Sequence, residues 1–391
     1  MKILLVTPIV PRVDARNGAA RVMHGQLTAL REAHEVSVVT FSAVDPSDRA
    51  CLRDLVASGV EVHEIGAWVP RWLVAAKRDV QGWIGRRRGW PALGAPGLVD
   101  RTLPLLLQSL TSERRFDILQ VENIGFGPMA LPTTLPRILT EHEVFAPSAG
   151  DKRDGARYQP ALWRQFDRVQ VFSGRDADAI RALAPDVASR VRVNPFGVAL
   201  PPPLDPARVE PSTILFVGGF RHPPNIDAAL WLARDILPRV RARHPAARLV
   251  IVGEAPPRDI SALADAHVEV IGGVDSVQPY MERAAVVAAP VRTGGGMRVK
   301  VLEALAAGKA VVTTTLGTEG LLGAPAELPL SVADAAAEFA AEIVRLLADP
   351  AARIATGREA RLFASTRHTW ADYRMRLERT YAEVLSEHHG A

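Results

Sequence analysis

The sequence predicts an α/β protein with two doubly wound parallel-sheet domains of similar size and a helical C-terminus. First, short runs of β-branched residues alternate with helical patterns, which is typical of a parallel sheet covered by helices on both faces. Second, the alternation stops at residues 198–212, a proline-rich stretch without periodicity, and then starts again. Third, only helical patterns follow from about residue 333. We therefore expect domains at 1–200 and 213–365 and a last helical segment at 366–391.

The expected strands form two series. The opening run is interpreted as a strand rather than a signal peptide, because its apolar stretch is short and ends in prolines. The first series comprises residues 2–8, 35–41, 60–65, 116–122, 136–142, 168–173 and 190–196, with helices at 19–33 and 52–57. The second series comprises residues 213–220, 247–253, 268–272, 285–290 and 309–315, with helices at 225–241, 258–265, 275–283 and 298–307. Three helices are expected after residue 333.

Composition limits the function classes. Hydrophobic residues make up 48% of the 391 residues and charged residues 23%, which is ordinary for a globular protein. The net charge of +4 gives no reason to expect binding to nucleic acid, although a local basic face could hold anions. Cys51 is the only cysteine, which excludes an intramolecular disulfide and suits a reducing cytoplasm. No apolar run is long enough to span a membrane. We expect a cytoplasmic protein.

The segment at residues 294–314 carries the strongest signal for a ligand. Two cations, Arg298 and Lys300, open a helix there, where positive charge opposes the helix dipole. An anion such as a diphosphate would reconcile them, and Glu303 could meet two ribose hydroxyls. A solvated helix start with a structural salt bridge is the alternative. Three glycines that precede the cations would let the backbone approach a ligand: Gly294, Gly295 and Gly296.

Three further loops follow predicted strands. Gly18 follows the first strand and opens a helix, where a glycine lets a backbone N–H approach a phosphate or sugar; an ordinary loop is an equal alternative, because a single glycine is a weak signal. The G-x-G-x-x-G fingerprint is absent, which argues against a nicotinamide dinucleotide site. His142 ends another strand and is either a catalytic group or a satisfied polar residue. The loop after residue 315 either contacts a ligand or forms a capping turn; its candidate residues are Gly317, Thr318 and Glu319.

Residues 71–90 combine six basic residues and one acidic residue with interleaved tryptophans. This composition suits an interfacial helix on anionic lipid, or a region near an acceptor with a lipid diphosphate. A solvated helix that packs its aromatic side chains on the first domain is the alternative. The interfacial interpretation predicts peripheral attachment to the inner face of the plasma membrane. The residues expected on the membrane or acceptor face are Trp72, Lys77, Arg78, Trp83, Arg86, Arg87 and Arg88.

The stretch "GGGMRVKVLEALAAGKAVVTTTLGTEGL" resembles the nucleotide-sugar motif of the group 1 (family 4) glycosyltransferases. "NGAARVMHGQLTALRE" is similar to the first loop and helix of that family, and "FDILQVE" to its strand leading toward the acceptor. "LTEHEVF" resembles its short His-acid segment, and "TILFVGGFRHPPNIDAALWLARDILPRV" the start of its donor domain. The resemblance covers most of the chain. It implies the GT-B fold, in which two Rossmann-like domains face a central cleft and the last helix crosses back to the first domain.

The resemblance also implies roles for single residues. Glu303 matches the acid that holds the nucleotide ribose, Gly18 the glycine that faces the donor diphosphate, and His142 the histidine near the donor sugar and the reacting centre. The sequence departs from the family pattern at two positions. Gly295 stands where a second glutamate is frequent, which puts the donor sugar in doubt. Gly219 stands where the donor loop often has an arginine, and no lysine follows in that loop.

These departures lead to a hypothesis about the diphosphate. Arg221 is expected to compensate in part for the missing arginine. The remaining phosphate-binding charge is expected to have moved to Arg298 and Lys300, because cations appear there that the usual motif lacks.

The resemblance implies a retaining hexosyltransferase that moves a sugar from a nucleoside-diphosphate sugar to a hydroxyl acceptor in cell-surface glycan, polysaccharide or glycolipid synthesis. No cofactor is expected, and no metal either, because the sequence has no H-x-x-x-H helix and no cysteine pair. The expected partners are the donor, a glycan or lipid-linked acceptor and an anionic membrane surface, without nucleic acid. The alternatives are an epimerase or phosphorylase on the same fold, or a degenerate paralogue that binds nucleotide-sugar without transfer.

Overall fold

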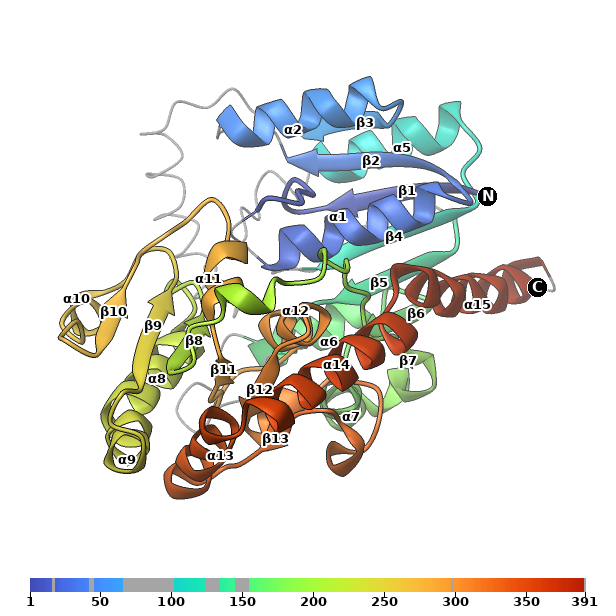
Figure 1. The fold of residues 1–391 in the computed structure, drawn as a ribbon. Coiled ribbons are helices and arrows are strands. Elements are labelled where there is room, and N and C mark those ends of the chain that lie inside the picture. Colours follow the sequence, from blue (N-terminus) through green and yellow to red (C-terminus); the bar gives the residue numbers. More distant parts are fainter. Residues whose placement is uncertain are drawn as a thin grey trace. The chain divides into compact units, whose positions relative to one another are not determined.

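The computed structural model describes residues 1–15, 18–41, 46–65, 102–123, 134–144, 155–296 and 298–389. The chain forms two compact units (Figure 1). The first comprises Met1–Val13, Ala19–Asn194 and Tyr373–Ala391, and the second comprises Asp14–Gly18 and Pro195–Asp372. These limits lie a few residues from those expected at 200 and 366.

The first unit contains a seven-stranded parallel sheet in the order β3-β2-β1-β4-β5-β6-β7. Its strands are nearly continuous apolar runs because helices cover both faces; residues 3–6 of β1, for example, are fully buried. Every strand of the first predicted series is present. Their bounds are β1 Lys2–Thr7, β2 Glu35–Phe41, β3 Glu61–Ile65, β4 Ile118–Asn123, β5 Arg137–Glu141, β6 Arg168–Val171 and β7 Val191–Val193.

The helices of the first unit include three that the sequence patterns did not reveal, α5, α6 and α7. Helix α2 also begins earlier than expected, since Pro46 suits the first turn of a helix, where no backbone N–H is needed. A hydrophobic core cluster lies between the sheet and α5, α6 and α7, around the fully buried Trp163. The bounds are α1 Gly18–Arg31, α2 Pro46–Ala57, α5 Thr102–Glu113, α6 Gly155–Trp163 and α7 Gly174–Leu183.

The second unit contains a six-stranded parallel sheet in the order β10-β9-β8-β11-β12-β13. The five strands of the second predicted series are confirmed. The sixth, β13, is a two-residue strand, too short to leave a pattern in the sequence. The bounds are β8 Thr213–Val217, β9 Arg248–Val252, β10 Val268–Val270, β11 Val286–Ala289, β12 Ala310–Thr313 and β13 Ser331–Val332.

The helix expected at 225–241 is present, but it widens in the middle. A π turn at Leu232–Ile236 separates α8 from α9, and the N–H of Leu237 donates to Leu232. The turn lies next to Pro238, which has no backbone N–H and cannot continue regular α-helical bonding. The bounds of the helices from α8 onward are α8 Pro223–Trp231, α9 Leu237–Arg243, α10 Arg258–Ser261, α11 Gln278–Arg283, α12 Val299–Ala306, α13 Ala336–Ala348, α14 Pro350–Arg367 and α15 Trp370–His389.

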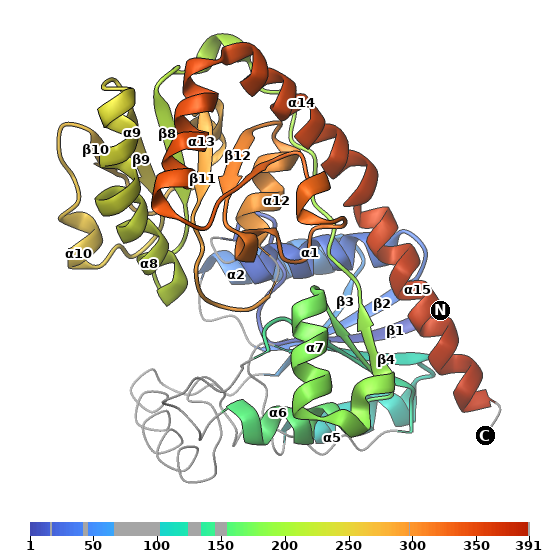
Figure 2. The ribbon, with the colours of Figure 1, turned by 90° about the horizontal axis from the view of Figure 1, so that it is seen from below.

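The three helices predicted after residue 333 are α13, α14 and α15. Helices α13 and α14 lie on β12 in the second unit (Figure 2). Helix α15 begins in the second unit and continues in the first, where it runs beside β6 and β7 (Figure 1).

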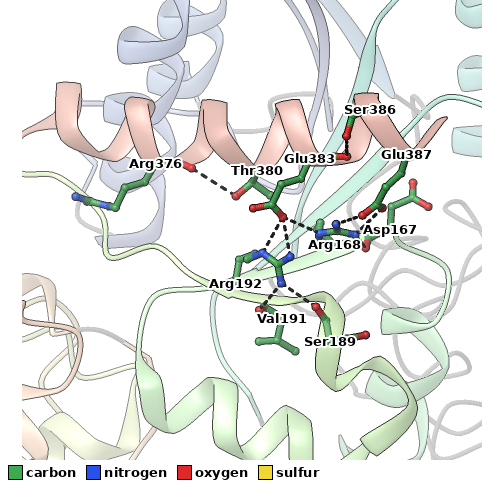
Figure 3. Close-up of polar contacts among 10 residues, drawn as sticks. All are labelled: Asp167, Arg168, Ser189, Val191, Arg192, Arg376, Thr380, Glu383, Ser386 and Glu387. Carbon is green, nitrogen blue, oxygen red and sulfur yellow. Dashed lines mark hydrogen bonds and ion pairs between the residues drawn. The ribbon is translucent and has the colours of Figure 1, made fainter. Parts of the chain in front are cut away.

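Ion pairs hold the C-terminal half of α15 to the sheet of the first unit (Figure 3). Arg168 of β6 donates from Nη2 to Glu387 Oε1 over 2.5 Å, and Arg192 of β7 donates from Nη2 to Glu383 Oε2 over 2.7 Å. These hydrogen bonds raise the pKa of Arg168 and lower the pKa values of both glutamates. The paired charges therefore help to fix α15 on the first unit.

Candidate functional site

The strand order of the second sheet reverses between β8 and β11. Ligands of open α/β sheets bind at such a reversal, outside the carboxyl ends of the strands. The loop after β8 leads into α8, and the loop after β11 carries the three glycines and leads into α12. Most of the residues predicted to bind the donor belong to these two loops or to α12.

Arg298 shapes the glycine loop. Its Nη1 donates to the carbonyl of Gly295 over 2.8 Å and its Nη2 to the carbonyl of Gly294 over 2.9 Å. Gly294 and Gly296 have φ values of +98° and +72°, a region that residues with a Cβ rarely adopt. The buried guanidinium therefore holds a loop that only glycine forms easily. A direct contact between Arg298 and phosphate stays a prediction.

Lys300 reaches from α12 to the loop after β8. Its Nζ donates to Asn225 Oδ1 over 2.5 Å, and Asn225 Nδ2 donates to the carbonyl of Gly219 over 2.8 Å. The ammonium also lies 4.8 Å from the centre of the Phe216 ring. A Cβ on Gly218 would come within 2.9 Å of Nζ, so this glycine leaves room for the lysine. The loop that lacks a lysine of its own thus receives one from α12.

The electrostatics of this site favour an anion. Burial, and then the charge of Arg298, lower the pKa of Lys300 to about 7, while Glu303 acts in the opposite direction. Burial lowers the pKa of His222 as well, and the charges of Lys300 and Arg298 lower it further. A bound anion would relieve this repulsion. His222 and Asn225 were not predicted from the sequence; their signal was the pair of polar side chains around two prolines at the start of a helix.

Glu303 lies one turn after Lys300 on the same face of α12 and is half-buried. Its predicted bond to ribose hydroxyls stays a prediction. Arg221 is 81% exposed along its side chain, and its Nε lies 3.6 Å from Glu254 Oε1. This exposure leaves Arg221 able to move toward a ligand.

The turn after β12 contains the other predicted donor residues. The N–H of Gly317 donates to the carbonyl and to the side chain of Thr314, over 2.9 and 3.1 Å. A Cβ on Gly317 would come within 1.8 Å of Thr313 Oγ1, so close packing explains this glycine. The Gly317 N–H is engaged in its own turn, and donor contacts of Thr318 and Glu319 stay predictions.

His142 follows β5 in the first unit, and its side chain is 8% exposed. Its Nε2 lies 2.8 Å from Oε2 of Glu122, a fully buried residue near the end of β4. Glu122 was not predicted from the sequence. Its signal was the alternation of Gln120 and Glu122 with the apolar residues of the same strand, because a buried carboxylate is costly unless it is paired or hydrogen-bonded. Gly18 is the first residue of α1.

Two family models match the chain: "Glycosyl transferase 4-like domain" at residues 17–199 and "Glycosyl transferases group 1" at residues 211–349. Together they cover most of its length. The chain belongs to the group 1 glycosyltransferases. The predicted resemblance is thereby confirmed, and the two parallel-sheet units confirm the predicted GT-B fold.

Solved structures support the fold of this glycosyltransferase. Sucrose-phosphate synthase from Thermosynechococcus elongatus is 16% identical with a TM-score of 0.71, over 99% of this chain and 100% of that chain. S. aureus TarM, in complex with UDP, fondaparinux and α-GlcNAc-glycerol, is 12% identical with a TM-score of 0.69, over 97% of this chain and 100% of that chain. Anabaena HepE in complex with UDP-glucose is 15% identical with a TM-score of 0.65, over 99% and 100% of the two chains.

A match at higher identity covers less of the glycosyltransferase. The phosphatidyl-myo-inositol mannosyltransferase of Mycobacterium tuberculosis is 32% identical over 144 residues, which are 36% of this chain and 37% of that enzyme. The chain thus spans little more than a third of the length of this relative.

A metal-binding cluster and a membrane-spanning helix are both absent from the described residues. Among them, no group of three or more His, Cys, Asp and Glu side chains could hold a metal ion. No helix in the same part of the chain is both long and apolar enough to cross a membrane. The residues predicted for a membrane or acceptor face lie outside the described residues, so that interpretation stays a prediction from sequence; they are Trp72, Lys77, Arg78, Trp83, Arg86, Arg87 and Arg88.

Proposed function

We propose that this glycosyltransferase moves a hexose from a nucleoside-diphosphate sugar to a hydroxyl acceptor, with retention of the anomeric configuration. The observation that carries the proposal is the Lys300 ammonium, which lies at the carboxyl edge of the second sheet against Asn225 and a glycine backbone. A cation whose pKa burial lowers to about 7 gains most from an anion as its partner.

In this proposal each group in the second unit has one task. Lys300 binds the donor diphosphate, and Arg298 fixes the glycine loop and adds positive potential. Glu303 accepts hydrogen bonds from the ribose hydroxyls. The cations neutralise the diphosphate, so the chain's own residues supply the charge that transfer requires. The missing arginine and lysine of the donor loop are replaced from α12.

Retention follows if the leaving diphosphate acts as the base. The bond between the anomeric carbon and the phosphate oxygen breaks, and the acceptor oxygen bonds to the same face of that carbon. The acceptor hydroxyl gives its proton to the leaving phosphate oxygen, so the reaction balances without a protein nucleophile. We propose that His142 hydrogen-bonds to the donor sugar and stabilises charge at the reacting carbon.

For the acceptor, we propose a glycan or glycolipid of the cell surface, glycosylated on the cytoplasmic side. Two relatives support this choice by their names and ligands: the mycobacterial phosphatidyl-myo-inositol mannosyltransferase, and S. aureus TarM with α-GlcNAc-glycerol. The basic and aromatic composition of residues 71–90 suits a lipid-linked acceptor or an anionic membrane surface.

The experiment is a transfer assay with a panel of UDP, GDP, ADP and TDP sugars and glycolipid acceptors, with the anomeric configuration of the product read by NMR. We expect one nucleotide-sugar to be consumed only with acceptor and to give the retained anomer. An inverted product, donor epimerisation without acceptor, or phosphorolysis would contradict the proposal. Binding without any turnover would favour a degenerate paralogue.

Lys300→Met should weaken donor binding in the same assay. Lys309→Met is the matched control, because Lys309 is also buried, at the other end of α12, but donates to the carbonyls of Glu282 and Ala284. The control should lose stability and keep its donor affinity. If both variants lost affinity equally, Lys300 would have no special role.

A further inference from the structure

A buried carboxylate in the first unit receives hydrogen bonds from three sides. Oε1 of Glu122 accepts from Gln26 Nε2 of α1 and from Gln120 Nε2 of β4, each over 2.7 Å. Oε2 accepts from His142 Nε2 over 2.8 Å. Both glutamines and Glu122 are fully buried. A charge withdrawn from water to this degree is stable only with such donors.

Helix α15 fixes the orientation of this network. The hydroxyl of Tyr381 donates to Oε1 of Gln120. Burial raises the pKa of Tyr381 well above its usual value, so the hydroxyl remains a donor. The Gln120 carbonyl therefore faces Tyr381, and its amide N–H groups face Glu122 and Thr140. With two amides directed at Oε1, the Oε2 atom is left for the histidine.

The network determines which ring nitrogen of His142 carries a proton. Because Oε2 of Glu122 can only accept, Nε2 must be the protonated nitrogen of the neutral ring. The ring also lies edge-on to Phe172, with centroids 5.0 Å apart and planes at 83°, which restricts its rotation. Within the described residues, no other hydrogen bond to the His142 ring is present. Nδ1 is left with a lone pair that can accept a hydroxyl proton.

We propose that Glu122 is a positioning residue: it holds His142 in the Nε2–H tautomer, so that Nδ1 faces a hydroxyl of the donor sugar. This inference rests on the proposed function, in which His142 meets that sugar. Gln26 and Gln120 support Glu122 from the side opposite to the histidine. The arrangement is that of a hydrogen-bonded partner that sets the tautomer and the direction of a histidine ring.

The test is the ¹⁵N NMR spectrum of the His142 side chain, recorded without donor, in the wild type and in Glu122→Gln. In the variant, Oε1 can still accept from both glutamines, and the new amide nitrogen takes the place of Oε2. An amide N–H at that place donates to Nε2, so the proton of the neutral ring should move to Nδ1. We expect Nε2 protonated in the wild type and Nδ1 protonated in the variant.

Kinetics give the second measurement. Glu122→Gln should lower kcat about 10- to 100-fold, by analogy with the loss of the hydrogen-bonded partner of a metal-bound histidine, and change KM for the donor much less. Glu141→Gln is the matched control, since Glu141 is a buried carboxylate of the neighbouring strand that accepts from Trp163 Nε1. The control should keep the wild-type tautomer of His142.

A wild-type ring protonated on Nδ1 would overturn the proposal, and so would an unchanged tautomer in Glu122→Gln. If that variant did not fold, the wild-type spectrum would still decide. Failure of the proposed function is distinguishable, because it would appear as a wild type without transfer activity whatever the tautomer.

Discussion

The pKa of Lys300 leads to a quantitative prediction for donor binding. With a pKa of about 7 in the free protein, the ammonium is mostly charged at slightly acidic pH and mostly neutral at slightly alkaline pH. If the donor diphosphate binds only the charged form, its Kd should rise by the factor 1 + 10^(pH − pKa). From about pH 6.5 to about pH 8.5 this is a loss of affinity of roughly 25-fold, or about 1.9 kcal/mol.

Isothermal titration calorimetry with the best-binding nucleotide-sugar measures this dependence. The diphosphate diester of a nucleotide-sugar does not titrate in this range. His222 does not interfere either, because its pKa is lowered from 6.5 and the ring is mostly neutral throughout. Lys300→Arg is the control: a guanidinium stays charged, so the affinity of this variant should be independent of pH.

Stability without the donor should change in the opposite direction. Between a folded pKa of about 7 and an unfolded value of 10.5, the unfolded Lys300 holds a proton that the folded protein does not. The contribution of this residue to the free energy of unfolding therefore increases as the pH rises through this window. A wild-type affinity that is as flat with pH as that of Lys300→Arg would refute the assignment of the diphosphate to Lys300.

Three further predictions concern the two units. Gly218→Ala brings a Cβ into contact with the Lys300 ammonium. Donor binding, measured by calorimetry, should weaken about tenfold, or ~1.4 kcal/mol. The melting temperature, measured by thermal unfolding, should change little. Tyr381→Phe leaves the Gln120 carbonyl buried without this donor and should lower the free energy of unfolding by about 1–3 kcal/mol in urea titrations; no loss would contradict the hydrogen bond. Glu383→Gln removes a carboxylate whose pKa is lowered below 4.5. The free energy of unfolding should fall by up to about 1 kcal/mol at neutral pH, and this difference should disappear in acid as the wild-type carboxylate protonates. An equal loss of unfolding free energy at both pH values would contradict an ionic role.

Much of the fold was predictable because parallel strands that are buried on both faces leave dense apolar runs. The strands of both series could be placed in this way, whereas β13 is a two-residue strand that leaves no run. The π turn before Pro238 shows a further limit: the proline was visible in the sequence, but the helix continues because only its hydrogen bonding changes.

The candidate site was predictable where the signal is local. Arg298, Lys300 and Glu303 lie within six residues of sequence, and their position at a helix start indicated an anion. Their individual contacts were not predictable, because Asn225 meets Lys300 only through the neighbouring positions of β8 and β11. Glu122 was missed for the same reason, since two of its donors, Gln26 and His142, belong to other elements of the chain.

The most direct test of the account is a ligand-induced thermal shift with UDP, GDP, ADP, TDP and their sugars, on the wild type and on Glu303→Ala. A ligand that binds the native state raises the melting temperature with its concentration. We expect one nucleotide and its sugar to stabilise the wild type, and Glu303→Ala to lose most of this response. If no member of the panel stabilised the wild type at millimolar concentration, or if Glu303→Ala responded like the wild type, the proposed donor site on α12 would be wrong.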